Sequence, residues 1–390
     1  MNKIYSNNKK NKRELININY SSRVKKNNYD YLNLKGKKLF NFSSNDYLGL
    51  SKNNQLINSS KKWTNKYGTS LSSSRLISGN LDQIRKIEDL ISKYTFNERT
   101  IIFGSGFLLN LTLIPTLTGN NLGSRGKFCI FSDKLNHSSI NYGCHLTRQK
   151  VIRYNHNDLN HLEYLMKKTD KNIPKIIITE TLFSMDGDLI DVDGFRSVAK
   201  KYDSLLYFDE AHSMGVFGKR GFGLTSDNKK YDNEILVGTF GKAFGSYGAF
   251  VSCSEKLSKN IINSCSGLIY STALPPSVLG SIEKSVNMMP KLNLMRKKLL
   301  ENSYYLIEKL KKLSINTGKS NSQIIPIILN DLEKCNKLSE FLRKNNFFVK
   351  TIQSPTVPLG SERIRLSLTA TMDKNMLSKL ASLISRVNFL

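Results

Sequence analysis

A glycine-rich run that contains Lys242 is the first candidate for chemistry in this sequence. Gly238, Gly241 and Gly245 surround Lys242, and an apolar run that ends at Val237 precedes it. Few neighbouring Cβ atoms would keep a flat ligand away from the amine. A lysine amine whose pKa is lowered by burial or by nearby charge can form an imine with an aldehyde cofactor. The run by itself is equally compatible with a glycine-rich loop that carries a solvated lysine.

A second candidate closes the apolar run 205–208, where Asp209 comes directly after the run and His212 follows three residues later. A carboxylate at the carboxyl end of a strand can keep a pyridine nitrogen protonated, so that the ring withdraws electrons. A helix-capping aspartate beside a structural histidine explains the string equally well. The string Asp-Glu-Ala-His also resembles a helicase box, but no phosphate-binding G-x-x-x-x-G-K-[ST] segment precedes it. Five histidines, none paired at ligand spacing, disfavour a metal site.

Two further polar sites follow predicted strands. Ser105, Gly106 and Phe107 come after the apolar run 101–103 and open a predicted helix, whose free N–H groups suit a phosphate dianion. A helix cap with a glycine is the alternative. His137 comes after the run 128–131 and could stack on an aromatic ring, although a lone histidine is more often structural.

The elements that must position these residues alternate between apolar runs and amphipathic stretches from residue 82 onward. Asp82 is expected to cap a helix over residues 83–94. Strands are expected over residues 100–103, 128–131, 151–154, 175–179, 205–208, 235–237 and 249–252. Runs this rich in Ile, Leu, Val and Phe are typical of strands covered on both faces, so the pattern predicts a mostly parallel α/β sheet. Ligands lie outside the carboxyl ends of such strands, which is where the candidates occur.

The pattern changes after Pro275 and Pro276. Helices are expected over residues 277–289, 290–313 and 332–344 and at the C-terminus, with strands over 324–329, 348–352 and 363–368. This order predicts a small α+β domain. The chain is therefore divided into an N-terminal arm (1–45), a large domain (46–285) and a small C-terminal domain (286–390).

Composition limits the possible functions. The chain has 390 residues and a formal net charge of +28, but its lysines are spread along the whole length, which argues against a nucleic-acid-binding patch. No apolar stretch approaches the roughly 18 residues of a membrane span. Residues 1–13 lack the apolar core of a secretory signal. Five scattered cysteines without a C-x-x-C pair favour reduced thiols, so a soluble cytoplasmic protein is expected.

Several long strings, in this order, resemble the α-oxoamine synthases, a family of fold-type I pyridoxal-phosphate enzymes. The strings that carry the resemblance are residues 41–50, 180–188, 239–245, 269–276, 355–360 and 363–370. The resemblance covers about residues 41–371. It implies a large, mostly parallel sheet domain, a smaller C-terminal α+β domain, and pyridoxal 5'-phosphate (PLP) as cofactor.

The resemblance also implies roles for single residues. Lys242 would bond to the cofactor aldehyde and act as acid and base at the substrate Cα. Asp209 would pair with the ring nitrogen, His212 with the phenolic oxygen, and His137 would stack on the ring. The remaining cofactor contacts would come from Gly106, Phe107, Ser184, Thr239 and, from a partner subunit, Thr272.

The substrate side of the site follows from the same resemblance. Arg365 would bind an amino-acid carboxylate, which its guanidinium matches bidentately. Thr356, Asn45 and His137 would line the same side. Because Thr272 and Asn45 would both reach across subunits, a homodimer with its active site at the interface is expected.

The sequence departs from the family pattern in three places, one of which is the string 180–183, where Glu-Thr-Leu-Phe replaces the more usual E-G/S-V-F. Ser70, Ser72 and Ser73 replace glycines of a usually glycine-dense loop. The arginine that meets the distal end of the acyl chain has no clear match, and Arg23 is only a weak candidate.

The activity implied is the decarboxylative condensation of L-alanine with a pimeloyl thioester, on CoA or acyl carrier protein, to 8-amino-7-oxononanoate. Sibling reactions of the same family, glycine with acetyl-CoA or with succinyl-CoA, are the first alternative. A catalytically silent, basic RNA-associated scaffold is the second. It predicts loss of Lys242, Asp209 or Arg365, yet all three residues are present.

Overall fold

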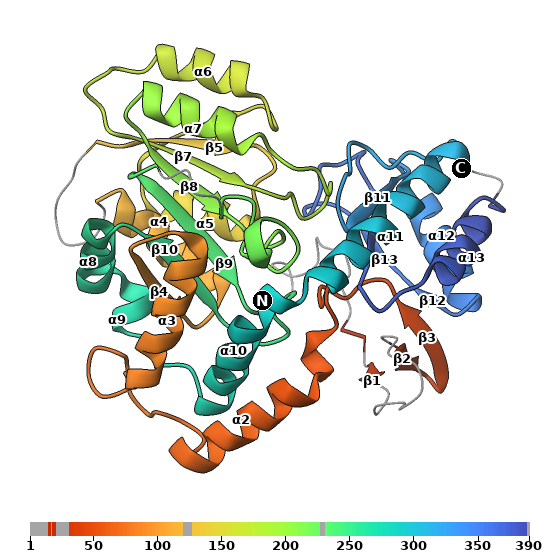
Figure 1. Ribbon diagram of the computed structural model, residues 1–390. Helices are drawn as coiled ribbons and strands as arrows, with labels where there is room; N and C mark the ends of the chain where they lie inside the picture. The colour runs from red at the N-terminus through yellow and green to blue at the C-terminus, as the bar shows by residue number, and fades with distance from the viewer. Residues whose placement is uncertain (1–14, 17, 21–30, 120–126, 227–230, 388–390) are drawn as a thin grey trace, which may run out of the picture.

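The computed structural model describes residues 15–16, 18–20, 31–119, 127–226 and 231–387 (Figure 1). Arg23 and the segment 1–13 lie outside the described residues.

A seven-stranded sheet forms the centre of the larger part of the molecule (Figure 1). Its strands, from one edge to the other, are β4 (Arg99–Phe103), β10 (Ala249–Cys253), β9 (Glu234–Thr239), β8 (Leu205–Asp209), β7 (Lys175–Glu180), β5 (Cys129–Asp133) and β6 (Lys150–Tyr154). Only β10 runs antiparallel to its neighbours. The prediction of a mostly parallel sheet is therefore confirmed.

Alternate residues of the strands pack against helices on opposite faces of the sheet, as the period of two in a strand requires. Ile176 and Ile178 pack on one face with α4 (Gly106–Leu117), α5 (Ser138–Leu146), α8 (Glu255–Ser264) and α9 (Ser266–Ile269). Ile177 packs on the other face with α6 (Leu159–Lys167) and α7 (Val192–Lys201). On the part of the sheet made by β9 and β10, this second face is covered by α2 (Asn54–Tyr67), α3 (Asp82–Thr95) and α10 (Pro276–Met288).

The C-terminal part holds a three-stranded antiparallel sheet in the order β11 (Ile324–Ile328), β14 (Arg363–Ser367) and β13 (Lys350–Ile352). It packs with α11 (Asn293–Lys312), α12 (Leu332–Lys344) and α13 (Lys374–Ile384). The single strand expected over residues 348–352 is wrong, because the chain serves two sheets here. Phe347 and Phe348 form β12 (Phe347–Phe348), which pairs with the N-terminal segment, and β13 pairs with β14.

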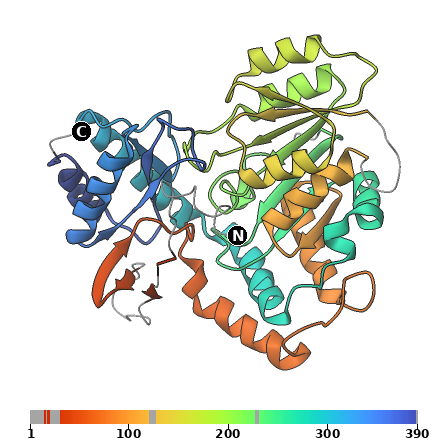
Figure 2. The same ribbon diagram turned by 180° about the vertical axis from the view of Figure 1, so that it is seen from behind.

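The N-terminal segment packs against the C-terminal part of the chain. A four-stranded sheet runs in the order β1 (Asn19–Tyr20), β2 (Tyr31–Leu34), β3 (Lys37–Asn41) and β12. Both views show these red strands beside the blue C-terminal elements (Figures 1 and 2). Residues 42–48 then run along the three-stranded sheet, since Ser367 N donates to Phe42 O and Ala370 N donates to Tyr47 O, each at 2.8 Å. This path brings residues near position 45 to residues near position 365.

Two local expectations are corrected. The helix expected over residues 83–94 begins at Asp82, and its N-cap is Leu81 without a side-chain cap, so Asp82 is not the cap. A carboxylate in the first turn still favours the helix through its dipole. The helix expected from Pro290 begins at Asn293, after a 3-10 turn over Met289–Lys291. Two further 3-10 turns cover Leu50–Lys52 and Lys219–Gly221.

Several global properties of the described chain bear on function. No described helix is long and apolar enough to cross a membrane. All five cysteines are free and buried. Among the described residues, no group of His, Cys, Asp and Glu could hold a metal ion.

Candidate active site

A cavity of about 220 Å³ lies at the carboxyl ends of the central strands. Residues that follow β5, β7, β8 and β9 line it together with the beginning of α4. The lining residues are Gly106, Phe107, Asn110, His137, Ser139, Glu180, Asp209, Ala211, His212, Val237, Gly238, Thr239 and Lys242. Seven residues that the sequence singled out for cofactor binding therefore meet at one place: Gly106, Phe107, His137, Asp209, His212, Thr239 and Lys242.

Lys242 lies three residues beyond the end of β9, on the wall of this cavity. Burial lowers the pKa of its amine to about 8; the charges of Asp209 and Glu180 oppose this shift and the charge of Arg365 adds to it. A neutral amine is therefore available near neutral pH, as a nucleophilic lysine requires.

The glycines around Lys242 serve packing within the protein. A Cβ on Gly238 would lie 2.4 Å from the ring of Phe250, and one on Gly245 would lie 2.5 Å from the backbone of Leu50. Gly245 also has a φ of +62°. Glycine is therefore required at positions 238 and 245 by packing within the protein, whether or not a ligand is bound.

Asp209 is held as a buried carboxylate by two hydrogen bonds. Oδ2 accepts from Asn110 Nδ2 at 2.8 Å, and Oδ1 accepts from the backbone N of Ala211 at 2.9 Å. Asn110 is itself oriented by Tyr207, whose hydroxyl donates to Asn110 Oδ1 at 2.5 Å. Asn110 was missed in the sequence because it lies within an apolar helix. A single amide inside that apolar run was the available signal.

Glu180 is the second carboxyl group of the cavity and was also missed. It closes β7 beside Asp209, which closes β8, and the two residues are paired in register. Burial raises the pKa of Glu180 well above its ordinary value, and the charge of Asp209 raises it further. Its Oε1 accepts a hydrogen bond of 2.6 Å from the backbone N of His137. Both causes, burial and the charge of Asp209, favour the protonated form of Glu180.

The beginning of α4 supplies hydrogen-bond donors at one end of the cavity. Ser105 is the N-cap, and its hydroxyl accepts from Leu108 N at 3.2 Å. The backbone N–H groups of Gly106 and Phe107 have no acceptor among the described residues, and both residues line the cavity. A helix N-terminus with free N–H groups favours an anion.

His137 also lines the cavity and is the N-cap of α5. Its Nδ1 is 2.8 Å from the hydroxyl of Ser139, which holds the orientation of the ring. Loss of hydration and the charge of Lys242 lower the pKa of His137, and the charge of Asp209 partly opposes this shift. The ring is therefore neutral at neutral pH and suited to stack on a flat ligand.

A second cluster comes from the N-terminal segment and the C-terminal sheet. Arg365 is buried on β14, and both its Nη1 and Nη2 donate to Asn45 Oδ1 at 3.2 Å. Arg365 Nε donates to the backbone O of Ser184 at 2.5 Å. Tyr47 connects this cluster to the cavity, because its hydroxyl is 2.6 Å from His212 Nδ1. Asn45 thus contacts Arg365 of its own chain, so the expectation that it reaches across subunits is wrong.

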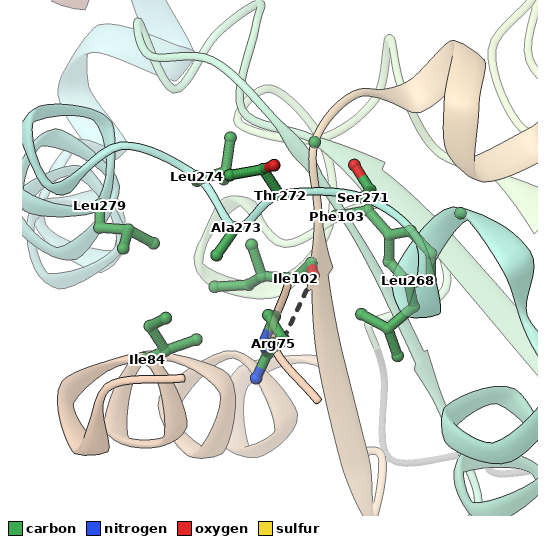
Figure 3. A pocket seen from close by; sticks show the side chains of 12 residues that line it. Arg75, Ile84, Ile102, Phe103, Leu268, Ser271, Thr272, Ala273, Leu274 and Leu279 are labelled. Atoms are coloured by element: carbon green, nitrogen blue, oxygen red, sulfur yellow. Dashed lines mark hydrogen bonds between the residues drawn. The ribbon is translucent and has the colours of Figure 1, made fainter. Parts of the chain in front are cut away.

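Three further predicted residues, besides Asn45 and Arg365, do not line the cavity. Ser184 contributes its carbonyl group to Arg365, and no hydrogen bond of its hydroxyl to the described residues is found. Thr356 is exposed, on a loop after β13. Thr272 forms an isolated bridge with Ser74 and lines a separate pocket (Figure 3).

The pocket beside Thr272 is not a ligand site within one chain. Its volume is about 20 Å³, which is room for about one water molecule. Its main polar side chain, Arg75, donates to Glu88 and to the carbonyl O of Ile102 (Figure 3).

Comparison with known proteins agrees with this geometry. The family model for aminotransferase class I and II matches residues 37–384. The 8-amino-7-oxononanoate synthase of Gluconacetobacter diazotrophicus is 37% identical over 350 residues, which cover 89% of this chain and 87% of that protein.

Solved structures agree as well. The 8-amino-7-oxononanoate synthase of Francisella tularensis superposes with a TM-score of 0.76 at 28% identity, covering 89% of this chain and 97% of that one. A structure of SPT with PLP superposes with a TM-score of 0.86 at 25% identity, covering 95% and 92%. The chain belongs to the aminotransferase class I and II family, in the group that contains the 8-amino-7-oxononanoate synthases.

Proposed function

We propose that this protein is a PLP-dependent acyltransferase of biotin biosynthesis. It joins L-alanine to a pimeloyl thioester, on CoA or on acyl carrier protein, and releases 8-amino-7-oxononanoate, CO2 and a free thiol. The observation that carries the proposal is Lys242, an amine with a pKa of about 8 in one cavity with the carboxylate of Asp209. The relatives named for this reaction supply the substrate pair.

The residues of the cavity fit PLP. Lys242 supplies an amine for the aldehyde, and Asp209 supplies a carboxylate for the ring nitrogen. The free N–H groups of Gly106 and Phe107, with the nearby Thr239, supply donors for a phosphate group. When bound, the cofactor supplies an electron sink that stabilises negative charge at the substrate Cα.

Each protein group has a defined task in the reaction. Arg365 binds the carboxylate of alanine, and Lys242 in its neutral form accepts the proton from Cα. Asp209, oriented by the hydrogen bonds that it accepts from Asn110 and Ala211, would pair with the pyridine nitrogen of the cofactor. His137 would cover one face of the cofactor ring.

The bonds that form and break in the proposed reaction account for every atom of the two substrates. A bond forms between Cα of alanine and the thioester carbonyl carbon, and the C–S bond breaks, so that the thiol leaves with a proton. The original carboxylate leaves as CO2, and Cα takes a proton in its place. Lys242 is the group within the cavity whose pKa, about 8, suits both proton transfers.

A homodimer is part of the proposal. Thr272 lies outside the cavity of its own chain, so it would contact the cofactor of the partner subunit. Large apolar side chains are exposed beside it: Tyr270 is 84% and Ile77 81% exposed, and Phe107, which lines the cavity, is half exposed. Their burial against a second copy would close the site from water. We place the enzyme in the cytoplasm, which agrees with five free cysteines.

Thiol release tests the proposed function. Purified protein with PLP should release thiol from pimeloyl-CoA only when L-alanine is present, and the organic product should have the mass of 8-amino-7-oxononanoate. Lys242→Ala should abolish release, whereas Lys259→Ala, at an exposed site on α8, should leave it unchanged. Faster turnover of glycine with acetyl-CoA or succinyl-CoA would assign a sibling reaction instead. Activity retained in Lys242→Ala would refute the role of the lysine.

A further inference from the structure

The contact between Tyr47 and His212 directly links the cavity to the cluster around Arg365. The phenol oxygen of Tyr47 is 2.6 Å from Nδ1 of His212, and both side chains are buried. The two residues lie 165 positions apart and come from different parts of the fold. His212 faces the cavity, whereas Tyr47 lies behind it.

The contact is fixed from both sides by backbone hydrogen bonds. Gln323 Nε2 donates to the backbone O of His212 at 2.9 Å. Ala370 N donates to the backbone O of Tyr47 at 2.8 Å. Both anchors belong to the C-terminal part, so the distance between phenol and imidazole is set by tertiary packing. The contact between Tyr47 and His212 is therefore part of the folded structure of the site.

Both rings are neutral at neutral pH. Burial lowers the pKa of His212 well below its ordinary value, and the charges of Lys242 and Arg365 lower it further. Burial raises the pKa of Tyr47, against the opposing charge of Arg365. A hydrogen bond between a neutral imidazole and a neutral phenol contains one proton, so one group must donate it and the other must accept it.

The surroundings make Tyr47 the donor. A second acceptor near the phenol, Asn45 Oδ1, lies farther away at 3.2 Å and already accepts two N–H groups of Arg365. Arg365 Nη2 also points at the phenol oxygen from 3.4 Å, and its positive charge makes the phenol a better donor and a poorer acceptor. With Nδ1 accepting, the proton of the imidazole must be on Nε2.

We propose that Tyr47 is a positioning residue that fixes His212 in the Nε2–H tautomer, so that the ring offers a hydrogen-bond donor to the cavity. No hydrogen bond of Nε2 to the described residues is found, which leaves this nitrogen for a ligand. The inference rests on the proposed function, in which His212 donates to the phenolic oxygen of PLP. Tyr47 also contacts Arg365, so one side chain orients the groups for the cofactor and for the substrate carboxylate.

Nitrogen NMR of the full chain tests the tautomer directly. With ¹⁵N-labelled histidine, only five side chains contribute signals, and His212→Asn identifies the set that belongs to His212. We expect a protonated Nε2 and an acceptor Nδ1 in the wild type at pH 7, with and without PLP. In Tyr47→Phe the Nδ1 signal should move downfield as the nitrogen loses its donor. A protonated Nδ1 in the wild type, or an unmoved Nδ1 signal in Tyr47→Phe, would overturn the proposal.

Kinetics provide the second readout. Loss of one hydrogen bond between neutral groups predicts a fall of about ten-fold in kcat/KM for Tyr47→Phe, mainly in kcat. The matched control is Tyr154→Phe, another buried tyrosine, whose hydroxyl donates to the carbonyl O of Ile178 at 3.4 Å and does not line the cavity. It should keep wild-type kinetics, and equal effects of the two variants would overturn the positioning role. Absence of any thioester activity in the wild type would refute the proposed function alone, because the NMR result does not depend on substrate.

Discussion

The titration of Lys242 gives the sharpest test of the electrostatics of this site. With a pKa of about 8, the amine is neutral in about a tenth of molecules at pH 7 and in about nine tenths at pH 9. An unperturbed lysine with a pKa near 10.4 is neutral in well under about 1% of molecules at pH 8. Brief labelling of cofactor-free protein with an amine-reactive reagent, followed by peptide mass spectrometry, should give a rate for Lys242 that rises with a midpoint near pH 8. Exposed Lys61 serves as the internal reference.

Two substitutions identify the charge that acts on this amine. Asp209→Asn removes a negative charge that raises the pKa of Lys242, so its midpoint should fall below pH 8. Glu180→Gln should cause a smaller shift, because burial and Asp209 already favour the protonated form of Glu180. A wild-type midpoint above pH 10 would refute the burial argument. A larger shift in Glu180→Gln than in Asp209→Asn would show that the charge resides on the glutamate.

Three further outcomes follow from the structure. His156 contacts buried carboxylates on both sides at 3.1 Å; burial opposes its charge, but these hydrogen bonds raise its pKa to about 10. Below pH 6.5, His156→Gln should therefore lower the free energy of unfolding by about 2–3 kcal/mol, a value reduced to allow for the partial exposure of the ring. The difference in thermal midpoint between this variant and the wild type should vanish as the pH rises through about 10. Asn110→Ala removes a donor to Asp209 and should lower kcat about ten-fold, with KM for alanine little changed in steady-state assays. Gly223→Ala places a Cβ 2.6 Å from the carboxyl carbon of buried Glu210, so we expect the free energy of unfolding in denaturant to fall by more than about 2 kcal/mol. Gly36→Ala, where an added Cβ would have no neighbour within 4 Å, should lower it less.

Many residues of the candidate site could be predicted from the sequence, because parallel strands end at the same side of a sheet. Asp209, His137 and Lys242 each follow an apolar run, and the structure brings all three to one cavity. The same rule applied to β7 would have found Glu180, which closes that strand. Asn110 could not be found in this way, because its role depends on one turn of α4 that faces Asp209 across the core.

The cluster around Arg365 and Tyr47 depends on contacts between distant segments, which no local sequence pattern predicts. Residues 42–48 lie against the C-terminal sheet because β3 pairs with β12, and β12 consists of only two residues within what the sequence presents as one strand. The alternation of apolar residues is too short there to reveal the division. Tyr47 therefore belonged to a string that indicates the family, but its contact with His212 was not predictable.

The sequence by itself determined the family, the cofactor chemistry and the strand-end residues, because these depend on local composition and on the order of the elements along the chain. The tertiary structure decided which groups share protons and charges. The lowered pKa of Lys242, the raised pKa of Glu180 and the tautomer proposed for His212 all arise from burial and from neighbours distant in sequence. Electrostatic interactions act over distances through space, so they are set only when the chain has packed.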